Sequence, residues 1–248
     1  MKAGYLFLAS FAIFPIVGAP LAGHPEFRRF GFVCRMVLAG GVGMVLLSAT
    51  MTIWALAGWR WGPVMVLPSA AVAFALKWLL RNSDLPLAAR REEAREPRSV
   101  TVIAHAVIAV SILAALAATL AARSTSPDLL LFWGPKAQQF ATARTIDAAF
   151  LSAPYLEYLH VYYPPLVTNV FAFGAIAAGR FPWGAATLTF PLALAATAVG
   201  LYGILRSDAP APCAAAASAL VVSALGLVGI DSSVAGNAEP FLLFFELL

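Results

Sequence analysis

The sequence predicts an all-α fold, a polytopic bundle of transmembrane helices with an extracytoplasmic loop of short juxtamembrane helices. The chain of 248 residues is 61% hydrophobic and only 11% charged, and its mean hydropathy is +0.85. Several of its apolar runs reach the length of about 18 residues that is typical of a membrane-spanning helix. In such a chain the net charge of +4 does not indicate nucleic-acid binding. The distribution of Lys and Arg matters more, because these residues collect on the cytoplasmic side of a membrane. We therefore expect membrane lipid as a partner and no nucleic acid.

Six long apolar helices are predicted, at about 4–22, 32–57, 62–80, 100–122, 183–205 and 213–230. The first run resembles a cleaved signal peptide, but it is longer than such a peptide and further spans follow at once. We interpret it as the first transmembrane helix. In the second run, small residues at 39–43 (AGGVG) allow close contact with another helix. Trp59 and Trp61 follow that run and are expected at a membrane interface.

The most charged interval, 81–98, determines the predicted topology. It holds five arginines and four acidic residues. Because Lys and Arg collect on the cytoplasmic side of a membrane, we expect this loop inside the cell. The run 100–122 then leads outward, the interval 126–165 lies on the extracytoplasmic face, and the amino terminus is also outside. We expect the protein in the bacterial inner (plasma) membrane.

The apolar run 164–179 decides where the later acidic residues lie. Its 16 residues would extend about 24 Å as a helix, which is less than the roughly 30 Å of the hydrocarbon core. The sequence therefore predicts a short re-entrant or surface helix that does not cross. Asp128, Asp231 and Glu239 then share the outer face.

The interval 126–165 is the long polar and aromatic stretch of the chain, and four of the six tyrosines lie in 155–163. Aromatic rings beside charged groups suit sugars and phosphates, and they equally suit a membrane interface. Asp128 follows Ser126 and Pro127, which are typical of a helix start, so its charge has both a structural and a catalytic interpretation. From 136 to 151 the apolar residues can share one face, which predicts a helix lying on the membrane surface.

Basic and metal-binding side chains leave alternatives open. Lys136 and Arg144 suit the phosphate of a substrate or that of a lipid headgroup. His160 can orient a substrate or be an ordinary interfacial histidine. Cys34 and Cys213 have no metal-ligand or disulfide spacing and are expected to be small buried apolar residues. The sequence therefore predicts no metal site and no particular cofactor, and it leaves dependence on a divalent metal open.

Three motifs in order resemble the GT-C superfamily of membrane glycosyltransferases. An Asp after an outward-running helix (Asp128) is followed by W-x-x-K-A at 133–137, by Y-P-P-L at 163–166, and by N-A-E-P-F at 237–241. The protein O-mannosyltransferase and aminoarabinose transferase branch is the most similar. The resemblance covers about 100–248, so we divide the chain at residue 99. The segment 1–99 is a three-helix membrane region with a basic cytoplasmic loop, and 100–248 is the GT-C-like module.

The resemblance implies inverting transfer of a sugar from a polyprenyl-phosphate donor to an acceptor at the extracytoplasmic face. Asp128 would be the general base, and Glu239 would be the second acidic site. The substrate-binding residues that it implies are Trp133, Lys136, Glu157, His160, Tyr162, Tyr163 and Arg180.

The chain also departs from this family pattern. Asp128 has no adjacent acid, Glu239 replaces the usual Asp, and Tyr162 and Tyr163 stand where aminoarabinose transferases have an acid and a base. The sugar and the acceptor are therefore left open. Two other classes remain, a transporter or flippase and a non-catalytic membrane scaffold. The last apolar run, from Phe241, reaches Leu248 without a helix end signal, so we expect the module to continue beyond it.

Overall fold

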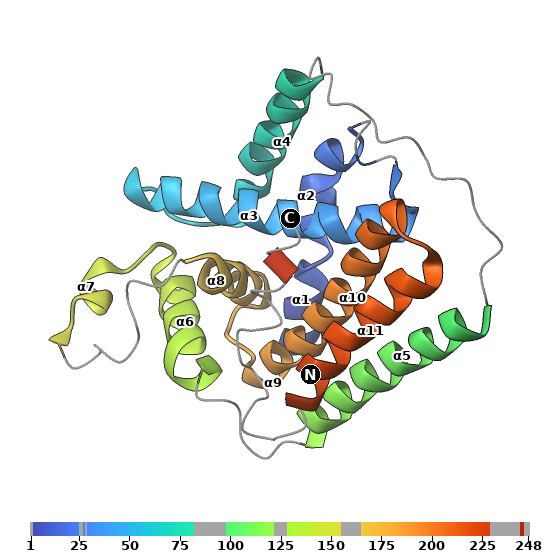
Figure 1. Cartoon of the computed structure of the whole chain (residues 1–248). Helices are drawn as coiled ribbons and strands as arrows, with labels where there is room; N and C mark the ends of the chain where they lie inside the picture. The colour runs from blue at the N-terminus through green and yellow to red at the C-terminus, as the bar shows by residue number, and fades with distance from the viewer. Residues whose placement is uncertain are drawn as a thin grey trace.

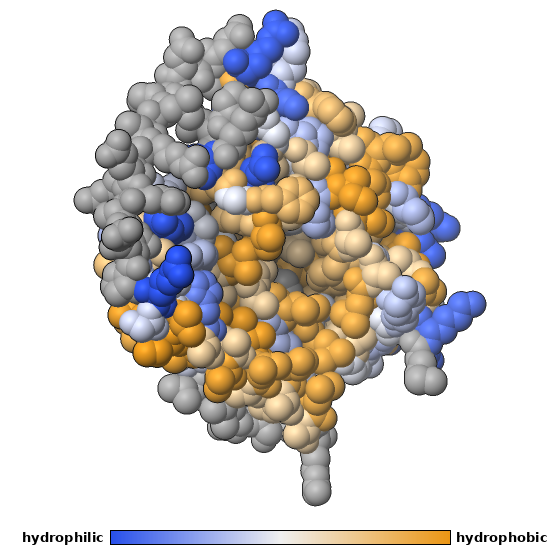
Figure 2. All heavy atoms as spheres, turned by 90° about the vertical axis from the view of Figure 1, so that its right-hand side faces the viewer, coloured by the Kyte–Doolittle hydropathy of each residue, from blue (hydrophilic) through white to orange (hydrophobic). Residues whose placement is uncertain are grey.

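The computed structural model describes residues 2–24, 27, 29–81, 98–121, 128–154, 165–228 and 244–245. Within these ranges the chain forms helices and no strand, which confirms the all-α prediction. Five described segments are long and apolar enough to cross a membrane: Lys2–Ala22, Phe32–Leu56, Pro63–Leu80, Arg98–Ala121 and Trp183–Asp208. The protein is therefore an integral membrane protein with a helical bundle (Figure 1). Figure 2 shows one face of it covered mostly by hydrophobic residues, as lipid contact requires.

The helices form where the apolar runs predict them. Their bounds are α1 (Lys2–Ser10), α2 (Ile13–Ala22), α3 (Phe32–Leu56), η2 (Pro63–Met65), α4 (Val66–Leu80), α5 (Arg98–Ala121), α9 (Trp183–Thr187), α10 (Thr189–Asp208) and α11 (Ala211–Val228). The first predicted helix is interrupted at Phe11 and Ala12, where the backbone bonds tighten to a spacing of three residues. Pro15 explains the interruption, because it has no N–H to donate to the carbonyl of Phe11 and its ring collides with that carbonyl.

Helices α2 and α3 cross at two glycines with almost no space between the backbones. A Cβ atom added to Gly43 would overlap the carbonyl oxygen of Phe14, and one added to Gly18 would overlap that of Ala39. In both cases the overlapping atom belongs to the backbone, so no change of side-chain rotamer could relieve the overlap. The close contact predicted from the small residues at 39–43 is confirmed.

Helix α8 (Leu166–Ala178) lies in the middle of the bundle (Figure 1). Its 13 residues extend about 20 Å, so its length is too short to span the hydrocarbon core, as the sequence predicts. The alternative of a surface helix is wrong, because every residue from Val167 to Ile176 is buried. A short helix with apolar residues on every side is stable only when protein or lipid surrounds it, and its few polar residues then need partners.

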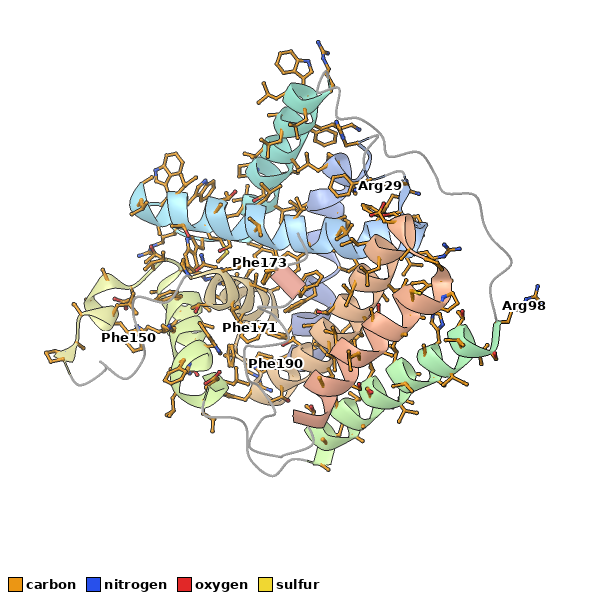
Figure 3. All side chains as sticks on the ribbon, viewed as in Figure 1. Arg29, Arg98, Phe150, Phe171, Phe173 and Phe190 are labelled. Carbon is orange, nitrogen blue, oxygen red and sulfur yellow. The ribbon has the colours of Figure 1, made fainter. Side chains whose placement is uncertain are left out.

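The core joins the two predicted halves of the chain. The ring of Phe171 in α8 packs edge-on against Phe7 of α1 and Phe190 of α10, with 6.0 Å between ring centroids in each pair. Figure 3 labels Phe171 and Phe190. Trp61 and Met65, from the link before α4, belong to the same core. The predicted boundary at residue 99 is therefore crossed by continuous side-chain packing.

The direction of the last helices follows from two contacts. A Cβ added to Gly134, at the start of α6 (Gly134–Ala143), would overlap the ring of Trp183, so α9 begins beside α6. At the far end of α10, Gly203 lies against Cys34 in the first turn of α3. Helix α11 packs on α10 after a link of two residues, so it runs back toward the end where α9 begins.

This course gives a topology prediction for Ser233 and Ala94, both of which lie outside the described residues. A membrane-impermeant thiol reagent on intact cells should label a cysteine at Ser233, because α11 returns toward the predicted outer end. A cysteine at Ala94, in the basic loop, should react only after permeabilisation. Labelling of Ala94 from outside would invert the topology, and protection of Ser233 would remove Glu239 from the side of Asp128.

Candidate active site

A single helical segment carries the first acidic candidate and the main basic candidate. It begins as the π-helical η3 (Asp128–Trp133) and continues without interruption as α6 (Gly134–Ala143). The change of helix type occurs at Gly134 and Pro135. Pro135 cannot donate to the carbonyl four residues earlier, and Gly134 leaves room for the ring of Trp183. Proline chemistry and close packing thus set this junction.

Lys136 is the ionisable side chain that the structure buries most clearly in this region. It is only 3% exposed, and its Nζ lies 5.1 Å from the centroid of the Trp133 ring, itself buried. Burial lowers the pKa of Lys136 to about 8, because removal from water disfavours the ammonium form. The face of the aromatic ring offsets part of this cost through a cation–π contact.

The prediction of one surface helix over 136–151 is wrong in two respects. Helix α6 packs against α8, and this contact turns Lys136 and Phe140 into the bundle instead of placing Lys136 on a polar face. The helix also ends at Ala143, because Arg144 adopts the left-handed conformation with φ of 59°. The carbonyl of Arg144 accepts a hydrogen bond of 2.6 Å from the backbone N–H of Trp61. The end of α6 is thus fastened to the link before η2.

Asp147 has a structural role in this region. One carboxylate oxygen accepts a hydrogen bond of 2.9 Å from the backbone N–H of Phe150 and so caps α7 (Ala148–Leu151). The other accepts one of 2.7 Å from Nε2 of Gln139. These bonds, that from Gln139 first, hold the pKa of Asp147 below its usual value.

The tryptophans of the link before η2 differ in position. Trp59 is exposed, as an interfacial residue should be. Trp61 is buried, and its indole N–H donates a hydrogen bond of 2.8 Å to the carbonyl of Met51. The prediction of an interfacial Trp61 is therefore wrong, because its ring fills space between α3 and Phe140 of α6.

Two further candidates lie at the same end of the bundle as Lys136. Asp128 is half-buried and is the first residue of η3. Arg180 is exposed and directly follows α8, which ends at Gly179 in the left-handed conformation with φ of 76°. The contact of Gly134 with Trp183 brings the chain after Arg180 beside the start of α6.

Glu157, His160, Tyr162, Tyr163 and Glu239 lie outside the described residues. Of the cysteines, Cys34 is buried as predicted, but Cys213 is exposed, because it lies on the outer face of α11. Within the part of the chain that the structure describes, no group of three His, Cys, Asp or Glu residues is close enough to hold a metal ion.

Asn169 is a buried polar residue that sequence reasoning missed. It is fully buried, and its amide nitrogen lies 3.1 Å from both Ser48 Oγ and Thr52 Oγ1 of α3. The signal was a lone amide side chain in the apolar run 164–179, where an unpaired polar group would be costly. The hydrogen bonds of Asn169 hold α8 against α3 and so fix the position of α8 in the bundle.

No protein-family description, curated protein or solved structure matches this chain. The chemistry that the candidate site can perform therefore has to follow from its own side chains. Asp128 is a carboxylate that can accept a proton, and Lys136 is an ammonium group that can pair with a phosphate oxygen. Both stand on one helical segment beside the end of a membrane span. That combination suits a reaction on a lipid-linked phosphate ester.

Proposed function

We propose that this protein transfers a sugar from a polyprenyl-phosphate donor to an acceptor at the extracytoplasmic membrane face, with inversion. Asp128 is the general base, and Lys136 pairs with the donor phosphate. The observation that carries the proposal is the buried ammonium of Lys136, held beside Trp133 on the helical segment that Asp128 begins. The motifs that resemble GT-C glycosyltransferases support the same assignment.

A buried lysine suits the binding of a lipid phosphate. Burial of a cation costs free energy, and an anion that pairs with it offsets that cost. A low-dielectric setting also strengthens the attraction between the two charges. The donor's hydrocarbon tail requires a protein embedded in the membrane, which the five apolar spans provide.

The placement of charges favours an enzyme over a carrier. Carriers place ionisable groups near the middle of the membrane, where substrate and coupling ions bind. In the described spans the lysines and arginines lie within the first or last turns, as Arg35, Lys77 and Arg206 illustrate. The candidate residues Asp128, Lys136 and Arg180 all lie outside these spans. In the proposal Glu239 contributes a second carboxylate, and Glu157, His160, Tyr162 and Tyr163 line the sugar pocket.

The lowered pKa of Lys136 predicts a pH profile. In the free protein the ammonium is charged below about pH 8 and loses its proton above it. We expect kcat/KM for the polyprenyl-phosphate sugar to fall about tenfold per pH unit above pH 8, because this ratio reports the free enzyme. The measurement is release of polyprenyl phosphate in membranes that contain the native acceptor.

Lys136→Arg is the matched variant, because arginine keeps its charge throughout this pH range. It should remove the loss of kcat/KM above pH 8, whereas Lys136→Ala should lower kcat/KM at every pH. A pH profile that is identical in Lys136→Arg and in the natural protein would contradict the assigned role.

The stability of the fold provides a separate test of the lowered pKa of Lys136. The folded chain binds fewer protons than the unfolded chain between about pH 8 and the ordinary pKa of 10.5. Lys136 should therefore destabilise the fold most at neutral pH, and Lys136→Met should remove that penalty.

A further inference from the structure

The end of the bundle opposite Lys136 gathers basic side chains. There α3 begins beside the last turns of α10, since Phe30 and Cys34 pack with Ile204. The ends of α2 and α4 also meet, because Nε2 of His24 lies 3.1 Å from the carbonyl oxygen of Leu80. The described cations at this end are Arg29, Arg35, Lys77, Arg81, Arg98 and Arg206. Asp208 is the one acidic residue that the structure describes here, so positive charge is in excess among the described residues of this end.

Arg35 is the cation whose surroundings indicate a ligand. Its Nε is buried, and it makes no hydrogen bond with any described residue. A buried N–H without an acceptor costs about 1–3 kcal/mol, and more for a charged group, so an external acceptor is favoured. The start of α3 adds to the positive potential, because it has no side-chain cap at Gly31 and no acidic residue in its first turn.

The neighbours of Arg35 indicate that this ligand is a lipid. Phe32 and Val33 in the same first turn are 67% and 62% exposed, which in a membrane span means contact with acyl chains. The guanidinium of Arg29 lies 4.9 Å from the centroid of the Phe30 ring, and Phe30 in turn packs on Cys34. Arg29 is thus held near the first turn of α3, as Figure 3 shows. Exposed apolar side chains beside two guanidinium groups match a phospholipid, whose acyl chains contact the former and whose phosphate contacts the latter.

We propose that the first turn of α3 binds an anionic phospholipid, with Arg35 as the principal phosphate partner and Arg29 as the second cation. The planar guanidinium of Arg35 presents two parallel N–H groups to a phosphodiester, and this geometry favours arginine over lysine. The excess of cations at this end favours a lipid with net negative charge over a zwitterionic one. The site lies away from Asp128 and Lys136 and does not depend on the proposed glycosyl transfer.

The test is lipid retention by the purified full chain. The protein is equilibrated with nanodiscs of equal parts phosphatidylcholine and phosphatidylglycerol, and the lipid that stays bound after transfer to detergent is measured by native mass spectrometry. The natural protein should retain phosphatidylglycerol in preference to phosphatidylcholine. Arg35→Gln should lower that retention about tenfold, which corresponds to loss of one charge-assisted contact. Arg35→Lys should keep part of it, because it keeps the charge but loses the paired N–H groups.

Arg60→Gln is the matched control, because Arg60 is an exposed arginine in the link after the opposite end of α3. It removes the same charge and should leave phosphatidylglycerol retention unchanged. Equal losses in Arg35→Gln and Arg60→Gln would overturn the proposal in favour of a general charge effect. Displacement of the lipid by millimolar inorganic phosphate would overturn it too, since the site would then recognise a free anion. If Arg35→Gln does not give a monodisperse protein, the comparison of Arg35→Lys with Arg60→Lys decides the question in the same way.

Discussion

Asp128→Asn is expected to lower the rate of sugar transfer by about 100-fold or more without changing the amount of protein in the membrane. Asparagine keeps the size of the side chain and much of its hydrogen bonding, but it cannot accept the acceptor's proton. Asp128 is also the first residue of η3, so its charge has a structural role available to it, an interaction with the helix dipole. Loss of that interaction alone would cost under about 1 kcal/mol, and Asn is itself a good residue at a helix start.

Asp147→Asn is the matched control for this prediction. Asp147 is another acidic residue at a helix start in the same region, and its carboxylate is occupied by Phe150 and Gln139. The two variants lose the same charge, so a rate change confined to Asp128→Asn would be specific to the proposed base. The measurement is transfer from a polyprenyl-phosphate sugar in membranes that carry equal amounts of each protein. Unchanged turnover in Asp128→Asn would contradict the proposed mechanism and would leave Asp128 with only a structural role at the start of the helix.

Gly43→Ala is expected to destabilise the bundle by about 1–3 kcal/mol, the usual cost of overpacking, although alanine is the better helix former by about 1 kcal/mol. The added methyl group would overlap the carbonyl oxygen of Phe14, and a backbone atom can move only if α2 moves with it. Since α2 and α3 make the most extensive helix contact in the described chain, we expect loss of folded protein in detergent extracts. The measurement is the midpoint of thermal unfolding in detergent.

Gly40→Ala, one turn earlier in the same helix, provides the control. A Cβ atom at Gly40 would meet Cγ of Pro15 at 3.6 Å, which is ordinary van der Waals contact. This variant gains the helix propensity of alanine without overlap, so its unfolding midpoint should stay the same or rise. Equal effects of the two substitutions would show that backbone approach at Gly43 does not limit the packing of α2 on α3.

Much of the fold follows from the sequence because lipid selects for long apolar helices. The positions of α3, α4, α5 and α10 agree with the predicted runs, since about 20 apolar residues are needed wherever a helix crosses. The close crossing at Gly43 was also predictable, because only small residues let two backbones approach.

The sequence could not decide which apolar surfaces face protein and which face lipid. Helix α5 exposes Val102 and Ile103, whereas α8 buries ten consecutive residues, although both read as apolar runs. Lipid chains are about as apolar as a protein core, so hydropathy does not distinguish the two environments. The inward position of Lys136, the burial of Trp61 and the contacts of Asn169 depend on which helix packs beside each residue. These features were decided by the tertiary structure, because only packing determines whether a polar group in an apolar surrounding meets a partner.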